Sequence, residues 1–277
     1  MNYVLINVSI RDDSILEKEL TENIFKTLAY SAKFKDKKTK TVDFDYVLVP
    51  INEYPISESD DVKGFITSHT NCTYDKDITD INVRLAYETL YTLFSPVIDK
   101  KFTFNVVMYL TDESFSVFYS DGSSSPKTKS AGYASIFLKE KVDELSKTKD
   151  DVYDELTDAY YSVEINYGKV DVGTNNIGEL TGVKKSIESA TDKQVQVLVS
   201  DSEYSLKCFR EWIHNWKANG YKGSNKKPIL NCDLIKSIQE LIEKSGKIYL
   251  FRWTKGHNDN ALNDLCDLYA KTAIGIN

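Results

Sequence analysis

The segment VQVLVSD, residues 195–201, decides the fold class of this chain because it joins a short apolar run to an acidic residue. Its valines recur at every second position, as in a buried β-strand, and Asp201 continues their spacing. A carboxylate in line with buried valines is costly unless it is paired or binds a metal ion. Since an α/β sheet presents its site at strand ends, Asp201 is a candidate functional residue.

A second segment, FSVFYSD at residues 115–121, has the same pattern and ends in Asp121. A single aspartate after a strand commonly forms a turn, so neither acid is decisive alone. Two such acids in one domain weaken the interpretation as turns without deciding between turns and a shared site.

The residues around these two segments predict a mixed α/β sheet with helices on both faces, in the order three strands, helix, strand, helices, strand, helix. Further strands are expected at 136–141, 158–170 and 247–253, and helices at 178–190, 203–219, 232–244 and 261–273.

The first part of the chain, residues 1–112, reads as a separate small α/β accessory domain, with the boundary at 111–114 before a domain of residues 113–277. Strands are expected at 1–10, 42–51 and 102–110, and helices at 15–30 and from Thr79 or Asp80 to Phe94. The lysine-rich stretch 33–40 and the polar stretch 57–80 are typical of solvated loops.

The net charge of −7 hides an uneven distribution along the chain. Residues 1–113 hold 13 basic and 19 acidic residues, whereas 207–236 hold seven basic and two acidic ones. A local basic stripe of this kind suits a phosphate backbone, so a nucleic-acid partner is compatible with the acidic total.

The composition argues against a membrane or secreted protein. No run approaches eighteen apolar residues, and the start MNYVLINVSI lacks the features of a secretory signal. The four cysteines form no C-x-x-C pair, which predicts a reducing compartment and a cytoplasmic location.

Three more acids lie on predicted helices. Glu179 follows Thr174-Asn175-Asn176 at a helix start, where the helix dipole favours an acid in any protein. Asp264 and Asp267 are three apart and share a helix face, which also fits a solvated face with Asp267 paired to Lys271.

The combination of these segments resembles the ribonuclease H family, in its bacterial-like type 1 form, over about residues 115–273. Residues 212–234 resemble the basic handle of that form. The segments that carry the resemblance are YSDGS at 119–123, TNNIGEL at 174–180, SDS at 200–202, WIHNWK at 212–217, KGH at 255–257 and NDLCD at 263–267. Two stretches depart from the family. SSPKTKS at 124–130 replaces a glycine-rich stretch and adds lysines suited to phosphates, and 139–160 is longer and more charged than usual.

The resemblance implies a five-stranded mixed sheet and endonucleolytic hydrolysis of the RNA strand of RNA–DNA hybrids, with 5′-phosphate and 3′-hydroxyl products, in primer or hybrid removal during replication. The implied catalytic residues are Asp121, Glu179, Asp201, His257 and Asp267. Four carboxylates so close together cannot all ionise without a cation, so they should hold two Mg²⁺ ions, with Mn²⁺ as a substitute.

The implied substrate contacts surround these acids and extend into the handle. They are Gly122, Ser123, Thr174, Asn175, Asn176, Trp212, Trp216, Lys217, Lys226, Lys227 and Asn231. Trp212 and Trp216 are four apart on one helix face, which favours packing of the handle over stacking on bases.

Two alternatives stay open: a non-catalytic module that binds hybrids or docks proteins, and a fragment of a larger polyprotein such as a reverse transcriptase. No polymerase-type acidic pair is evident in residues 1–113, which argues against the second. The acidic residues 1–112 are expected to dock a protein partner or a second copy of the chain.

Overall fold

The computed structural model describes residues 2–11, 26, 28–36, 38–51, 81–94, 102–256 and 260–276. The chain divides into two compact units, Met1–Glu113 and Ser114–Asn277. No helix in the described ranges has both the length and the apolar character needed to cross a membrane.

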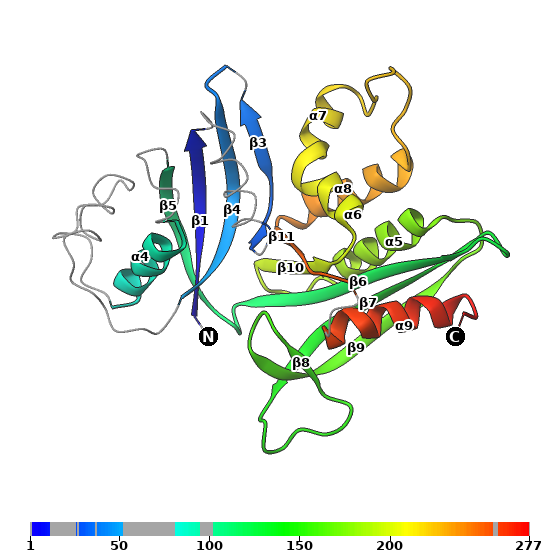
Figure 1. Cartoon of the computed structure of the whole chain (residues 1–277), viewed down its shortest axis with the longest axis horizontal. Helices are drawn as coiled ribbons and strands as arrows, with labels where there is room; N and C mark the ends of the chain where they lie inside the picture. The colour runs from blue at the N-terminus through cyan, green and yellow to red at the C-terminus, as the bar shows by residue number, and fades with distance from the viewer. Residues whose placement is uncertain are drawn as a thin grey trace. The chain divides into compact units, whose positions relative to one another are not determined.

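The first unit is built on the central strand β1 (Asn2–Arg11), which pairs antiparallel with β4 (Thr41–Ile51) and β5 (Phe102–Thr111). Two short strands, β2 (Ala29–Tyr30) and β3 (Lys33–Asp36), also pair with β4 (Figure 1). Alternate residues of β1 pack in one core with the helix α4 (Ile81–Phe94). This unit therefore has its own hydrophobic core.

In the first unit the three expected strands are confirmed as β1, β4 and β5, whereas two other predictions are corrected. Ala29 and Tyr30, expected in a helix, form β2, while most of the expected helix 15–30 and the loop 57–80 lie outside the described residues. Lys33–Asp36, expected in a loop, is a strand, because its backbone gains hydrogen bonds by pairing antiparallel with β4. The helix expected to end at Phe94 is present as α4.

The second unit contains a mixed sheet in the order β11-β10-β6-β7-β9-β8. The strands are β6 (Phe115–Ser125), β7 (Ser130–Val142), β8 (Val152–Asp154), β9 (Ala159–Val170), β10 (Val195–Ser200) and β11 (Ile248–Trp253). Strand β10 runs parallel to β6 and β11, whereas β6, β7, β9 and β8 pair antiparallel. The predicted five-stranded mixed sheet is confirmed, with the short β8 added beside β9.

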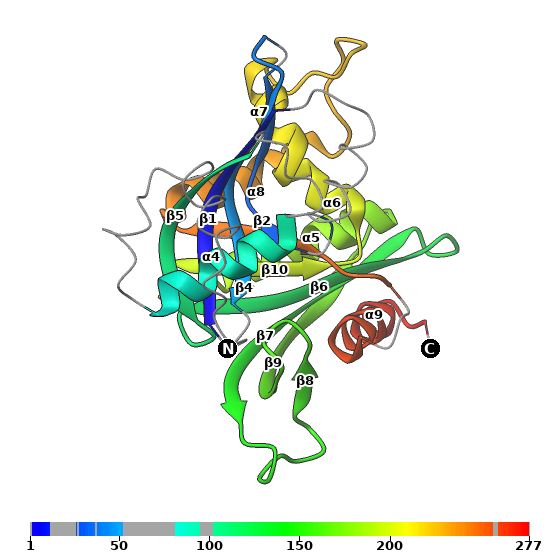
Figure 2. The ribbon, with the colours of Figure 1, turned by 60° about the vertical axis from the view of Figure 1, so that its left-hand side comes forward.

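Helices cover both faces of this sheet, as predicted. They are α5 (Asn175–Glu188), α6 (Glu203–Lys207), the π-helical turn η2 (Cys208–Trp212), α7 (Ile213–Ala218), α8 (Cys232–Ser245) and α9 (Ala261–Ala273). Leu180 and Val183 of α5 share a core with Phe118 of β6 and with α6 and α8. Helix α9 packs on β6 and β7 from the other side (Figure 2).

Three boundaries of the second unit differ from the sequence expectation. Strand β7 begins at Ser130 rather than at Ile136. Strand β6 continues four residues beyond Asp121, because antiparallel pairing with β7 extends from Asp121↔Ala134 to Ser125↔Ser130. Asp121 therefore lies within a strand rather than at its end. Helix α5 begins at Asn175 rather than at Gly178, so Glu179 lies in its second turn.

Candidate active site

The two strand carboxylates are brought together by the parallel pairing of β6 and β10. Tyr119 is the register partner of Val199. Asp121 lies two residues after Tyr119 within β6, and Asp201 lies two residues after Val199, one residue past the end of β10. Side chains two apart on a strand share a face, so both acids continue the same face of the sheet. Asp121 is only 6% exposed, and Asp201 is partly buried.

Glu179 joins them because α5 crosses β6 at very short range. A Cβ atom at Gly122 would lie 2.0 Å from the backbone nitrogen of Glu179, so only glycine permits this crossing. The carboxylate of Glu179 then accepts hydrogen bonds from Asn175 Nδ2 at 2.8 Å and from the hydroxyl of Ser202. Glu179 is thereby held at the start of α5 beside the strand acids.

Asp267 belongs to α9, which packs on the face of the sheet opposite to α5. Its side chain is 20% exposed, and its Oδ2 accepts a hydrogen bond from Lys271 Nζ at 2.6 Å. This is the ion pair expected from the i, i+4 spacing, and it is confirmed. Asp264, on the same helix, is exposed.

The charges of neighbouring acids contribute to the raised pKa values of Asp121 and Glu179. Burial raises the pKa of Asp121 to about 8; the charges of Asp201, Asp267 and Glu179 act in the same direction, against a hydrogen bond from the Gly122 N–H. Burial also raises the pKa of Glu179, aided by the charge of Asp201 and opposed by the bonds from Ser202 and Asn175. The cluster therefore has an excess of negative charge, which a cation would relieve.

The donor set fits a hard divalent ion, because carboxylate oxygens are the ligands that Mg²⁺ prefers. Within the described residues, no three His, Cys, Asp or Glu side chains are arranged as a finished metal cage. Instead the acids are engaged by protein donors, namely Lys271 on Asp267 and Asn263 on Asp201. A carboxylate has two oxygens and about four acceptor positions, so a single bond from Asn263 or Lys271 is compatible with metal binding at the same acid.

Asn263 and Ser202 were missed by the sequence analysis. Asn263 Nδ2 donates to Asp201 Oδ2 at 3.2 Å, and Ser202 both contacts Glu179 and caps α6 by accepting from the Ser205 N–H at 3.2 Å. Both lie inside the quoted segments 263–267 and 200–202, which was the available signal. Such donors orient acidic ligands, so these residues belong to the candidate site.

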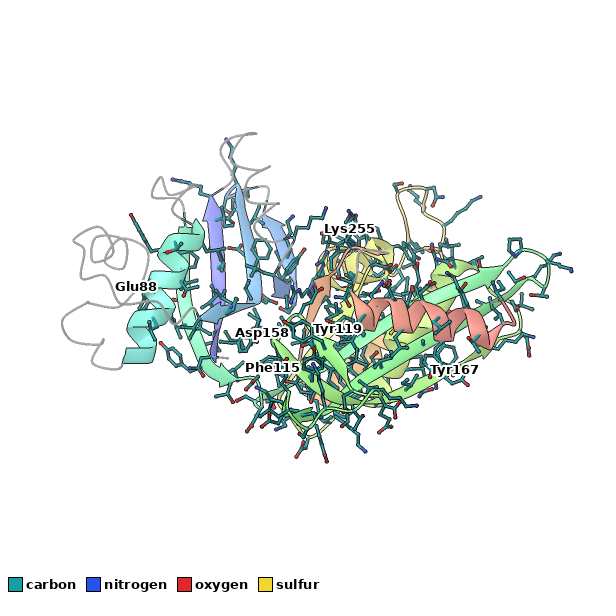
Figure 3. The ribbon with its side chains drawn as sticks, turned by 60° about the horizontal axis from the view of Figure 1, so that its bottom comes forward. Glu88, Phe115, Tyr119, Asp158, Tyr167 and Lys255 are labelled. Carbon is teal, nitrogen blue, oxygen red and sulfur yellow. The ribbon has the colours of Figure 1, made fainter. Side chains whose placement is uncertain are left out.

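A buried hydrogen-bond network borders the site on the side of the inserted segment 139–160. Asp154 is fully buried and accepts from the Tyr119 hydroxyl at 2.7 Å and from Thr157 N and Oγ1 at 3.0 and 2.6 Å. Asn260, whose side chain caps α9, donates to Glu155 at 3.4 Å. Figure 3 labels Tyr119 and shows it near the start of α9.

His257 lies outside the described residues. The residue before it can be placed: a Cβ atom at Gly256 would lie 2.3 Å from Asp201 Oδ2. The chain leading to His257 therefore passes directly against a candidate catalytic acid.

The predicted substrate contacts fall into two groups. Near the acids, Gly122 and Ser123 are buried in β6, Thr174 precedes α5, Asn175 is exposed, and Asn176 is partly buried. In the handle, Lys226 and Lys227 are exposed, whereas Lys217 forms an ion pair with Glu243. Asn231 donates to the Tyr204 hydroxyl at 3.2 Å, at the start of α8.

The packing role expected for the two tryptophans is confirmed. The rings of Trp212 and Trp216 lie 5.3 Å apart, and Tyr204 lies 6.1 Å from Trp212. Both tryptophans are partly buried against the core that holds α5, α6 and α8.

Comparisons with known proteins match the same part of the chain. The family model for RNase H matches residues 113–275. A ribonuclease H of Polaromonas sp. strain JS666 is 36% identical over 108 residues, 39% of this chain and 68% of that protein. A ribonuclease H of Pseudoalteromonas atlantica is 34% identical over 113 residues, 41% of this chain and 72% of that protein. The crystal structure of LC9-RNase H1, a type 1 RNase H with the type 2 active-site motif, aligns with a TM-score of 0.45 and 21% identity over 58% of this chain and 72% of that one.

Proposed function

Because the chain belongs to the ribonuclease H family, we propose that its four clustered carboxylates form a hydrolytic centre for the RNA strand of RNA–DNA hybrids. The enzyme is an endonuclease and a hydrolase, as its family is. The products are 5′-phosphate and 3′-hydroxyl ends, and the proposed role is primer or hybrid removal during replication.

One observation carries the assignment of the site: Asp121, almost fully buried, has three further acids as its electrostatic neighbours. When bound, two Mg²⁺ or Mn²⁺ ions supply Lewis-acid stabilisation to an in-line displacement at phosphorus. Asp121, Glu179, Asp201 and Asp267 would hold these ions. Asp121 is the most buried of these acids, and the charges of the other three contribute to its raised pKa.

The residues around the acids have positioning roles in this proposal. Ser202 and Asn263 fix the oxygens of Glu179 and Asp201 through the hydrogen bonds described above. Preorganised ligands reduce the rearrangement needed when the substrate arrives. His257 is assigned proton transfer or assistance to product release, because an imidazole titrates near neutral pH and Gly256 lies against Asp201.

Recognition of the hybrid is assigned to the start of α5 and to the handle. Thr174, Asn175 and Asn176, together with Gly122 and Ser123 of β6, are suited to the minor groove and to the 2′-hydroxyl groups that distinguish RNA from DNA. Lys226 and Lys227 would contact phosphates without regard to sequence. Lys217 is a weaker candidate than expected, because Glu243 already balances its charge.

Residues 1–112 are proposed to be an accessory domain and 113–277 the catalytic domain, a division supported by the two compact units and by the start of the family match at residue 113. A protein partner or a second copy of the chain is the proposed ligand of the acidic accessory domain. A cytoplasmic location is proposed too, in keeping with the free cysteines Cys208, Cys232 and Cys266. A protein of residues 113–277 alone should fold and cleave hybrids.

The deciding experiment uses the full chain and an RNA–DNA hybrid labelled on the RNA strand. Cleavage in Mg²⁺ that stops with EDTA, with little cleavage of single-stranded or double-stranded RNA, supports the proposal. Asp264→Asn, which changes an exposed acid of the same helix, is the matched control and should keep full activity. Hybrid binding without cleavage would instead favour the non-catalytic alternative.

A further inference from the structure

The turn between β6 and β7 is closed by hydrogen bonds and carries two lysines. It spans residues 126–129 and is closed by the Lys129 N–H bonding to Ser125 O at 2.8 Å. Ser125 and Ser130 are the last register pair before it, and the Thr128 and Ser130 hydroxyls lie 2.6 Å apart. Lys129 has a left-handed backbone, with a φ of 57°, which fixes where the chain reverses.

This turn is fastened to the segment that begins α5. The Gly173 N–H donates to Lys129 O at 2.9 Å, directly before Thr174 and Asn175. Asn175 in turn donates to Glu179 of the acid cluster. The turn and the start of α5 therefore form one surface at the same end of β6.

The charges on this surface are available to a ligand. Lys127 and Lys129 are exposed, and within the described residues neither has an acidic partner in an ion pair. Some other lysines are already paired: Lys169, on β9, pairs with Asp171, and Lys217 of the handle pairs with Glu243. Two ammonium groups without an acidic partner on one hydrogen-bonded turn favour a polyanion.

We propose that Lys127 and Lys129 form a second phosphate contact for the hybrid, separate from the handle. The two lysines would bind the sugar–phosphate backbone of the hybrid next to its minor groove, which Asn175 and Asn176 are proposed to contact. This inference rests on the proposed function, because it takes the hybrid as the ligand. It assigns the lysines of this turn to binding and to positioning of the substrate, with no part in the chemical step.

The test measures hybrid binding as a function of salt, using the full chain with Asp121→Asn to prevent cleavage. Each phosphate contact contributes about 0.9 to the slope of log K against log salt, so Lys127→Ala with Lys129→Ala should lower the slope by between about one and two. We expect the dissociation constant to rise about tenfold at low salt. Lys127→Arg with Lys129→Arg keeps both charges and should restore binding.

The matched control is Lys139→Ala with Lys149→Ala, which removes two exposed lysines at the other end of β7 and in the segment after it. Equal slopes for the two alanine pairs would overturn the inference. Since Lys129 has an unusual backbone conformation, the single change Lys127→Ala tests the same contact without altering that residue. Failure of the unmodified chain to cleave hybrids would count against the proposed function, whereas cleavage with unchanged slopes would count only against this contact.

Discussion

Asp121 and Asp154 are two buried carboxylates with opposite surroundings. Asp154 is fully buried and receives three hydrogen bonds, from Tyr119 and from Thr157. Asp121 lies two residues beyond Tyr119 on the same face of β6, but its neighbours are three acids and a single backbone N–H. Burial is common to both. What distinguishes a structural carboxylate from a candidate catalytic one is whether its neighbours are donors or further acids.

The largest expected effect comes from Asp121→Asn, which should reduce cleavage of the hybrid by at least about a thousandfold, because it removes a ligand buried among the other acids. Without metal its free energy of unfolding should be equal to or above that of the unmodified chain, since the change relieves repulsion. Single-turnover cleavage and urea unfolding measure the two effects. Turnover near that of the unmodified protein would exclude Asp121 from the chemistry.

The opposite result is expected for Asp154→Asn. Thr157 donates two hydrogen bonds to Asp154, from its backbone N–H and its hydroxyl. The NH₂ group of an asparagine is itself a donor and cannot accept them, so the variant should lose about 1–3 kcal/mol of unfolding free energy. Its cleavage rate, measured well below its unfolding temperature, should stay within a few-fold of normal. A stable but inactive Asp154→Asn protein would break the distinction between the two carboxylates.

The pH dependence of stability sharpens the same comparison. Burial and the neighbouring acids raise the pKa of Asp121 from 3.8 to about 8, so the folded state holds a proton that the unfolded state releases. In EDTA, the contribution of Asp121 to the free energy of unfolding should therefore be most favourable at about pH 4 and be lost as the pH rises towards 8. Thermal unfolding across this range should show that Mg²⁺ opposes the loss and that Asp121→Asn makes the dependence shallower. A flat profile in EDTA would contradict the raised pKa.

A smaller effect is expected from Ser202→Ala. The hydroxyl donates to the charged Glu179, so its loss should raise the pKa of that acid further and weaken Mg²⁺ binding about two- to tenfold. Isothermal titration with Mg²⁺ measures this change directly. Ser202→Thr keeps both the donor and the cap of α6, so it should bind Mg²⁺ normally; equal weakening in both variants would assign the effect to packing.

Features that depend on neighbouring residues could be predicted from the sequence, whereas features that depend on contacts between distant residues could not. The limits of α9 and β10 were predictable because capping residues and period-two alternation are local signals. The residues of the acid cluster were identified by the resemblance of short segments. The extension of β6 past Asp121 and the bond from Tyr119 to Asp154, 35 residues apart, depend on strand register and on the path of an insertion. Neither has a local signal.

Strand β8 also bears on how this protein behaves at high concentration. It pairs with only the first three residues of β9, Ala159 to Tyr161, so in the described part of the second unit the rest of β9 lies at the rim of the sheet. An open rim invites strands of other molecules to add to it. Charged residues on this stretch, such as Glu164 and Lys169, oppose such addition. Substitutions that make β9 more apolar should therefore lower the solubility of the protein while its cleavage activity is still normal.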